Sequence, residues 1–394
     1  MLASTDRTNH LTDASDASAE LLGLIATERA RTRAQLTAAT GLSRSTLAKR
    51  LQLLLDAHLI SEHDTAPSGG RPSKLLTFNR STGVAVGVDI GEDHTKVALT
   101  DLVPGVLIES TGATDLDAGP EAVLGWVNAE ITRLISELGR PSSDIVGICL
   151  GVPAPVDWKH GRIVGPSVMH GWDGYDIRAA IRRVHHTTVM IDNDVNLLGL
   201  AEYRLHFSDA RYMLYVKAGT GIGSAIIVDG EPYRGANGAA GDIGHVHMAD
   251  AGEPLCRCGN LGCVEALAGG WALARDLRDH GMPVKTARDV AGLAQQGRPE
   301  AIQLLRQAGR IVGEATAAAI NILDPDVLVL GGVLSRAGDH LATGVRELVY
   351  RRCLPLTTTN LRIEISRVDG EHAGVLGAAQ LVIDRLLRLT APPM

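Results

Sequence analysis

The run VAVGVDIG occupies residues 84–91, and KVALTD occupies residues 96–101. Two apolar stretches of strand length thus flank a turn, and the first stretch ends with Asp89 and Gly91. Apolar runs of this length, bounded by glycine and charged residues, are typical of buried strands. Similar runs recur toward the C-terminus at residues 145–150, 189–191, 213–216, 224–228 and 327–330. Because segments with helical periodicity separate them, the pattern predicts α/β lobes.

The 394 residues are enough for two to four domains at roughly 100–200 residues per domain. The hydrophobic content of 45% and charged content of 21% are those of an ordinary globular protein. The longest nearly apolar stretch, residues 145–156, is broken by Gly and Pro and falls short of the roughly 18 residues of a membrane span. Residues 1–18 have no basic start followed by an apolar segment. We therefore expect a cytoplasmic protein without a membrane segment, with a disordered tail over residues 1–18.

The charge is unevenly distributed along the chain. The formal net charge is −7, yet residues 20–80 hold nine Lys or Arg against five Asp or Glu, so the rest of the chain carries −11. A basic module attached to an acidic body is typical of a nucleic-acid-binding head on a larger domain. Aromatic residues make up only 3% of the chain, which argues against the stacking surfaces of single-strand or RNA binders.

Three helices are predicted near the N-terminus. Ser18 can cap the first, which extends to residue 28, and the second covers residues 32–40. Gly41 ends the second helix and Ser43 can cap the third. The third helix has one apolar stripe, formed by Leu47, Leu51, Leu54 and Leu55. The short turn at residues 40–43 has the length and the glycine of a helix-turn-helix.

The outer face of the third helix carries hydrogen-bond donors close to its N-terminus: Arg44, Ser45, Thr46, Lys49 and Arg50. A recognition helix presents such side chains to base edges and phosphates in the major groove. The same pattern also fits a small three-helix bundle with a solvated basic face.

Two short strands, at residues 59–60 and 75–78, flank the sequence SGGRPS at residues 68–73. This arrangement is typical of a winged helix, in which Arg71 at the tip enters the narrow minor groove. A flexible linker is the alternative. We predict a winged helix-turn-helix over residues 19–80 that binds double-stranded DNA, followed by a body over residues 81–394.

Three of the five cysteines are close together in the sequence: Cys256, Cys258 and Cys263. Gly259 and Gly262 permit tight turns between them, so three thiolates and one imidazole can complete a tetrahedral, structural Zn²⁺ site. His245 and His247 both lie upstream, and either can supply the imidazole. Buried apolar cysteines are the alternative interpretation.

Five strings occur in order along the body: DIG at 89–91, DNDVN at 192–196, GTGIG at 219–223, GDIGH at 241–245 and CRCGNLGCVE at 256–265. Together they resemble the ROK family of repressors and sugar kinases, over roughly residues 19–385. The resemblance implies an actin-like, ribonuclease-H-like pair of lobes with a sugar cleft between them. It also implies that a member with an N-terminal winged helix is a transcription regulator.

The resemblance selects His245 as the fourth metal ligand and assigns the sugar pocket to Asn193, Asp194, Asp242, His245 and Glu265. In sugar-kinase relatives the Asp that matches Asp194 takes the proton of the attacking hydroxyl, so Asp194 is catalytic here only if kinase activity is retained. In a regulator the same carboxylate accepts hydrogen bonds from sugar hydroxyls. Without the resemblance, Asp194 also fits a plain strand-end turn.

The nucleotide side is expected to be degenerate. The residues that match it are Asp89, Gly91, Gly219, Thr220 and Gly221. Glu92 and Asp93 stand where kinases of the family have small neutral residues, and a carboxylate beside a polyphosphate costs on the order of 1 kcal/mol. The sequence therefore predicts a kinase scaffold that has lost phosphoryl transfer.

Two departures concern the sugar pocket. Asp242 stands where the family more often has Glu, and Ser167 or Val168 stands where a pocket loop usually supplies Asn. These changes predict weakened or redirected hexose recognition.

Taken together, the residues and the family resemblance imply a repressor of carbohydrate-related genes that acts as a homodimer or homotetramer on a DNA operator and responds to a sugar or sugar phosphate. One alternative is an ATP-dependent, glucokinase-like sugar kinase that carries a DNA-binding domain. Another is a regulator without an effector, whose pocket is vestigial.

Overall fold

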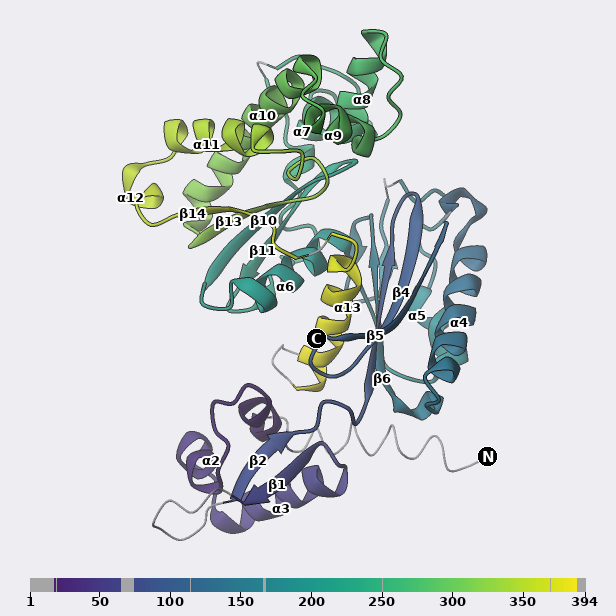
Figure 1. The fold of residues 1–394 in the computed structure, drawn as a ribbon, viewed down its shortest axis with the longest axis vertical. Coiled ribbons are helices and arrows are strands. Elements are labelled where there is room, and N and C mark those ends of the chain that lie inside the picture. Colours follow the sequence, from purple (N-terminus) through teal and green to yellow (C-terminus); the bar gives the residue numbers. More distant parts are fainter. Residues whose placement is uncertain are drawn as a thin grey trace.

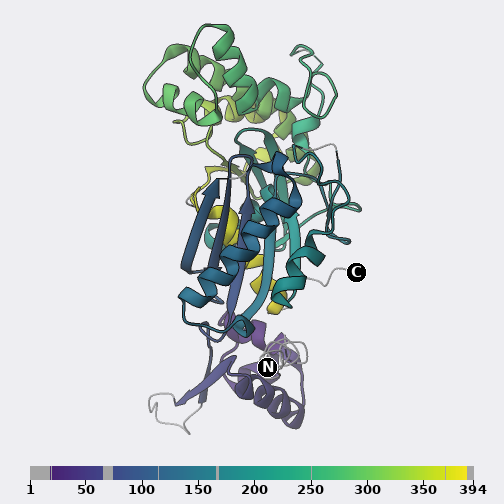
Figure 2. The same ribbon diagram turned by 90° about the vertical axis from the view of Figure 1, so that its right-hand side faces the viewer.

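The computed structural model describes residue 18 and residues 20–64, 74–113, 115–165, 168–249, 251–368 and 370–387. A small head lies at one end of the molecule and two larger lobes follow it along the long axis (Figures 1 and 2). The predictions for the tail before Ser18, for Arg71 and for Ser167 fall outside the described residues.

The head consists of helices and one hairpin. A helix over residues 20–26 is followed by α2 (Arg33–Thr40) and α3 (Arg44–Asp56). Strands β1 (Ile60–Asp64) and β2 (Lys74–Phe78) pair antiparallel, with Ile60 opposite Phe78. This order of helices and strands is that of a winged helix-turn-helix, as predicted.

Local chemistry sets the ends of the head helices. Thr32 forms a capping box with Gln35 at the start of α2, and Gly41 ends α2 in the left-handed conformation at φ 66°. Ser43 caps α3 by accepting a hydrogen bond from the backbone N–H of Thr46. Ser18 does not cap the first helix, because it is itself helical and its hydroxyl donates to the carbonyl of Arg50.

Each lobe is built on a five-stranded sheet. The first sheet has the order β5-β4-β3-β6-β9, with β3 (Val84–Ile90), β4 (His94–Thr100), β5 (Val106–Ala113), β6 (Ile145–Val152) and β9 (Val189–Asn193). The second has the order β12-β11-β10-β13-β14, with β10 (Tyr212–Ala218), β11 (Ile222–Val228), β12 (Glu231–Pro232), β13 (Val327–Gly331) and β14 (Arg362–Ile365).

The two sheets share one topology. In each, three consecutive strands pair antiparallel, and two later strands add in parallel beside the first of them. Parallel addition requires crossover connections, which the intervening helices provide. The duplicated arrangement is that of the predicted actin-like pair of lobes.

Helices cover both faces of the first sheet. Helices α4 (Pro120–Glu137) and α5 (Ile177–His185) pack on one face, and α13 (Ala373–Leu386) packs on the other. Helix α6 (Asp194–His206) lies between α13 and the second sheet (Figure 1). The pair α6 and α13 therefore forms the layer that joins the two lobes.

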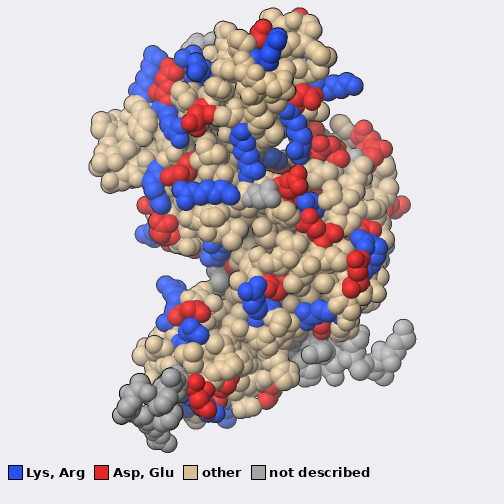
Figure 3. Space-filling model, in the orientation of Figure 1, with Lys and Arg blue, Asp and Glu red and all other residues tan. Residues whose placement is uncertain are grey.

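The far face of the second sheet is covered by α10 (Pro299–Leu323) and α11 (His340–Arg352). Three shorter helices complete this lobe: α7 (Val264–Ala268), α8 (Gly270–Asp279) and α9 (Ala287–Gln295). Helix α12 (Pro355–Thr358) protrudes from one side of this lobe, and the surface there carries no charged side chains (Figure 3). Leu354 and Leu356 are exposed on it.

The remaining elements are short. They are η1 (Leu116–Ala118), η2 (Ser142–Asp144), η3 (Ile243–His245), β7 (Val156–Asp157) and β8 (Arg162–Ile163). Among the described residues, the helices are all too short or too polar to cross a lipid bilayer.

The joining layer is tightly packed. A Cβ atom on Gly377 of α13 would lie 1.9 Å from the carbonyl oxygen of Leu197 in α6, so glycine is required where the two helices cross. Farther along, the Arg204 guanidinium of α6 donates to the buried Asp384 of α13 at 2.9 Å. Residues at the end of α13 belong to the same buried apolar cluster as Leu21 and Leu22 of the head, so the head packs against the body.

Candidate functional site

The exposed end of α3 carries the predicted DNA-contacting side chains. Arg44, Ser45 and Lys49 are exposed, and Thr46 and Arg50 are half-buried. Among the described residues, no acidic side chain forms an ion pair with Arg44, Lys49 or Arg50. Exposed cations at the start of a helix are the groups that contact phosphates in DNA complexes.

The hairpin is held against α2 by an acidic side chain. The Glu62 carboxylate on β1 forms ion pairs with Arg33 of α2 at 2.6 Å and with Lys74 of β2 at 3.0 Å. The hydrogen bond from Arg33 is the main reason that the pKa of Glu62 is lowered. The three residues position the two strands that lead to the segment containing Arg71.

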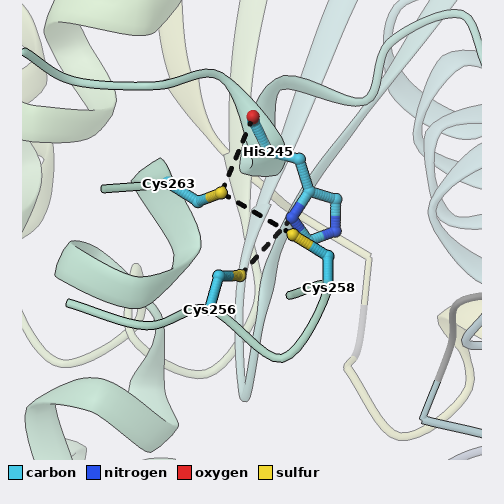
Figure 4. Close-up of side chains that lie close together, drawn as sticks. All are labelled: His245, Cys256, Cys258 and Cys263. Carbon is cyan, nitrogen blue, oxygen red and sulfur yellow. Dashed lines mark hydrogen bonds between the residues drawn. The ribbon is translucent and has the colours of Figure 1, made fainter. Parts of the chain in front are cut away.

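Four metal-ligating side chains meet beside η3 (Figure 4): His245, Cys256, Cys258 and Cys263. Their ligand atoms all lie within 4.8 Å of one another. The Nδ1 atom of His245 is 3.6 Å from the Cys256 sulfur, and the sulfurs of Cys258 and Cys263 are 3.7 Å apart. Since Zn–S bonds of about 2.3 Å place two sulfurs of a tetrahedral site about 3.8 Å apart, the residues fit a zinc ion.

The protonation of the thiols also bears on the fit. Burial raises the pKa of Cys256 and raises that of Cys263 to about 12. For Cys258, burial acts in the same direction, but the hydrogen bond from the backbone N–H of Asn260 and those from the two other thiols leave its pKa lowered. Three thiolates this close together require a cation, which a metal ion supplies.

The structure distinguishes the two candidate histidines. His245 lies on η3 with Nδ1 directed at the cysteines, which leaves its Nε2 outside the cluster. His247 is exposed and lies against Gly262, where a Cβ atom would be 2.8 Å from its ring.

Two of the predicted sugar-binding residues, Asn193 and Asp194, lie at the N-terminus of α6. Asn193 caps the helix by accepting from the N–H of Val195, and its amide donates to the carbonyl of Ala154. Asp194 follows as the first helical residue, with its side chain 10% exposed. Its carboxylate accepts a hydrogen bond from the Lys217 ammonium of β10, a contact between the two lobes.

Asp89 lies at the end of β3, against the first turn of α13. A Cβ atom on Gly374 would come within 2.3 Å of its carboxylate. Burial, and then the charge of Asp194, raise the pKa of Asp89, while Lys217 acts in the opposite direction. We call Asp89, Asp194 and Lys217, together with the glycine loop at residues 219–221, the interlobe site.

Glu265 borders the interlobe site from α7. Its carboxylate accepts from the N–H of Ile222 at 3.2 Å and from the Trp271 indole at 3.3 Å. The glycine loop is engaged as well, because the carbonyls of Gly219 and Thr220 accept from the first N–H groups of α8. Asp242 is exposed at the start of η3 and makes no capping bond there.

The two carboxylates of the turn after β3 are paired. Glu92 forms an ion pair with Arg257, which lies between Cys256 and Cys258, and Asp93 bonds the Nδ1 atom of His94 at 2.7 Å. The Arg257 guanidinium thus partly compensates the charge of Glu92, whereas the partner of Asp93 is an imidazole. The charge repulsion that we expected between this turn and a polyphosphate is weaker than for two unpaired carboxylates.

Ser167 and Val168 are the two residues that stand in the place of the pocket-loop Asn, and Val168 is the one that the structure describes. Its side chain is partly buried against the core of the first lobe. Trp172 of the same loop is fully buried, and its indole donates to the carbonyl of Leu116. Neither side chain replaces an amide as a sugar ligand.

Sequence reasoning did not single out Lys217, Arg234 or Arg257. Arg234 forms an ion pair at 2.6 Å with the buried Asp192 on β9, again between the lobes. Lys217 is the one charged residue in strand β10, and a lone charge in a buried strand is a sequence pattern that could have marked it as a functional residue. Arg257 shows no such signal, because its partner Glu92 is 165 residues away.

A winged helix-turn-helix head on two lobes of duplicated topology, with a Cys₃His cluster beside the interlobe site, defines a class of two-lobed, sugar-kinase-like proteins with a DNA-binding head. Residues 85–385 match the ROK family, so the chain belongs to that family.

Known relatives include both regulators and kinases. The xylose repressor of Bacillus subtilis (strain 168) is 26% identical over 90% of this chain and 91% of its own length. A ROK family transcriptional regulator, described as a homologue of the E. coli MLC protein, matches with a TM-score of 0.79 at 25% identity, over 96% of this chain and 98% of that one. A ROK hexokinase from Thermus thermophilus matches with a TM-score of 0.65 at 30% identity, over 78% of this chain and 100% of that one.

Proposed function

We propose that this chain is a sequence-specific DNA-binding transcription regulator, a repressor of carbohydrate-related genes. The observation that carries the proposal is the donor-rich, exposed start of α3 within a winged-helix head. The regulators match about nine-tenths of the chain or more, whereas the hexokinase matches 78% of it. Arg44, Ser45, Thr46, Lys49, Arg50 and Arg71 are the proposed DNA contacts.

The proposed effector is a sugar or sugar phosphate. Asn193, Asp194, Asp242, His245 and Glu265 would receive it, with Asp194 as an acceptor for hydroxyl groups. The Nε2 atom of His245 is free for a ligand if Nδ1 binds a metal. An effector changes DNA binding only if it binds the DNA-competent and DNA-incompetent conformations with different affinity.

The proposed metal is a structural zinc ion held by His245, Cys256, Cys258 and Cys263. With four protein ligands no coordination position stays open, so the ion would fix the loop between η3 and α7 rather than act on a ligand. We also place the protein in the cytoplasm, where DNA is accessible and thiolates stay reduced.

The proposed assembly is a homodimer or homotetramer. Two winged helices related by a two-fold axis read two half-sites of a pseudo-palindromic operator. Sedimentation velocity on the full chain distinguishes the two states, and a monomer at operator-binding concentrations would contradict the assembly.

The alternative function is an ATP-dependent sugar kinase, favoured by Asp194 at the N-terminus of α6 and by the glycine loop. An assay of ADP release over a panel of hexoses tests it. Turnover that Asp194→Asn abolishes would support the kinase and oppose the loss of phosphoryl transfer that we propose.

Capture of genomic fragments on the full chain, followed by band-shift titration of the recovered site at fixed salt, tests the regulator. We expect Arg44→Ala to weaken binding by about 1–3 kcal/mol, since a lost base contact has that cost. Arg183→Ala, an exposed arginine of α5 on the body, is the matched control. Equal losses for the two variants, or binding that does not weaken as salt rises, would contradict the assignment.

A further inference from the structure

Lys217 is the only charged side chain on β10, and its ammonium group contacts the carboxylate of Asp194. The strand belongs to the sheet of the second lobe, whereas Asp194 directly follows β9 of the first. The pair thus places a fixed positive charge from one lobe on an acidic group of the other.

A second carboxylate shares this cation. The charges of Asp194 and Lys217 both act on the carboxylate of Asp89, and Asp89 in turn contributes to raising the pKa of Lys217 above its ordinary value, against the effect of burial. The side chains of Asp89 and Asp194 are 22% and 10% exposed. Asp89 pairs with Gly151 of β6, where a Cβ atom would lie 3.7 Å from the Asp194 Cα atom, so the two poorly solvated acids come from neighbouring strand ends. The charges of His94 and Lys96 also act on Asp89, but Lys217 is the cation that contacts Asp194.

Two carboxylates in such an arrangement are ligands for a divalent cation, because Mg²⁺ and Mn²⁺ prefer oxygen donors. Enzymes that transfer phosphoryl groups use the metal to neutralise carboxylates and phosphates together. An ammonium group fixed on a strand supplies the neutralising charge without a metal. Its hydrogen bond also takes up one acceptor position of the Asp194 carboxylate, and the remaining positions stay available to the hydroxyls of a ligand.

We propose that Lys217 is the resident counter-ion of Asp89 and Asp194, and that it excludes a divalent metal ion, and with it a metal-bound polyphosphate, from the interlobe site. This inference rests on the proposed function, since it specifies the ligand class of the same site. The ligand is a metal-free polyol, whose hydroxyls donate to Asp194 and accept from Lys217.

The test is a titration of the zinc-saturated full chain with Mn²⁺, followed by electron paramagnetic resonance of the free ion. Zinc saturation keeps the thiolate cluster occupied, because Mn²⁺ is the weaker competitor for nitrogen and sulfur ligands. The variants are Lys217→Met and Lys217→Gln, which remove the charge, and Lys217→Arg, which keeps it. The double variant Lys217→Met with Asp194→Asn removes one of the two acids as well.

We expect Lys217→Met and Lys217→Gln to bind one Mn²⁺ at least about tenfold more tightly than the unmodified chain, since a repelling cation at contact distance is gone. Lys217→Arg and the double variant should bind Mn²⁺ as weakly as the unmodified chain. Circular dichroism establishes which variants are folded, and the glutamine variant retains a hydrogen bond to Asp194 if the methionine variant is unstable.

Equally tight Mn²⁺ binding by the unmodified chain, or no gain in a folded uncharged variant, would overturn the proposal. DNA is absent from this measurement. Failure of the operator-binding experiment would therefore remove the regulator assignment and leave the Mn²⁺ result standing. Conversely, failure of the Mn²⁺ experiment would remove the role of Lys217 and leave the regulator assignment standing.

Discussion

Glu92 and Arg257 form an ion pair at 3.2 Å that joins the turn after β3 in the first lobe to the cysteine loop of the second. The Arg257 guanidinium also lies over the Trp271 ring, 5.1 Å from its centroid. The turn that would face a nucleotide in a kinase is thus linked to the proposed metal loop. Each partner side chain is more than a third exposed, so water screens the attraction.

This pair predicts a small coupling energy. In a double-mutant cycle with Glu92→Gln and Arg257→Gln, we expect a coupling of about 0.2–1 kcal/mol in the free energy of unfolding that decreases at high salt. Urea denaturation at two salt concentrations measures it. A coupling of zero at low salt would mean that the contact does not contribute to holding the lobes together.

The cysteine cluster predicts metal-dependent stability. Cys263→Ser should lower the metal content from about one zinc per chain to almost none and lower the melting temperature, because the loop between η3 and α7 loses its cross-link. Elemental analysis together with thermal unfolding measures both effects. Cys353→Ser is the control, since Cys353 is buried away from the cluster; a similar loss of metal in that variant would contradict the ligand assignment.

Glu62 predicts acid sensitivity of the head. Its pKa in the folded chain lies below the ordinary value of 4.5, so its stabilising effect is complete above that pH and is lost as the pH falls below it. We expect Glu62→Gln to increase hydrogen exchange in β1 and β2 at neutral pH. Near pH 4 and below, after correction for intrinsic rates, the difference from the unmodified chain should shrink, and a constant difference would contradict this role.

The interlobe site predicts stabilisation by a sugar. A ligand at 100 times its dissociation constant should add about 2.7 kcal/mol to the free energy of unfolding. A thermal-shift screen with xylose and hexoses measures this effect. Asp194→Asn should reduce the shift, whereas Asp279→Asn, an exposed change on α8, should not. The absence of a shift with every sugar would favour a vestigial pocket.

The crossing of α6 and α13 predicts that two Gly→Ala changes have opposite effects. Gly377→Ala should lower the free energy of unfolding by about 1–3 kcal/mol, because the added methyl group meets the Leu197 carbonyl. Gly125→Ala on α4 has open space around it and should stabilise by about 0.4–1 kcal/mol through helix propensity and unfolded-state entropy. Urea denaturation compares the two, and equal effects would show that the helices can separate.

Much of the fold was predictable because its signals are local. The Gly41 turn, the Ser43 cap and the apolar stripe of α3 lie within a few residues of one another, and the structure confirms them, with Leu55 only partly buried. Strand β5, by contrast, was not predicted, because its half-exposed pattern lacks a continuous apolar run. The role of Ser18 was wrong, because its hydroxyl has a partner 32 residues away.

The sequence by itself determined the order of helices and strands, the cysteine spacing and the motifs that indicate the family, since each depends on residues close together in the chain. Only the tertiary structure decided that Glu92 meets Arg257 and that a lysine from the other lobe contacts Asp194, and it also places His245, the histidine that the resemblance selects, at the thiols. These are charge and coordination contacts between distant segments. Their partners are set by how the two sheets and the α6–α13 layer pack, and no local pattern encodes that packing.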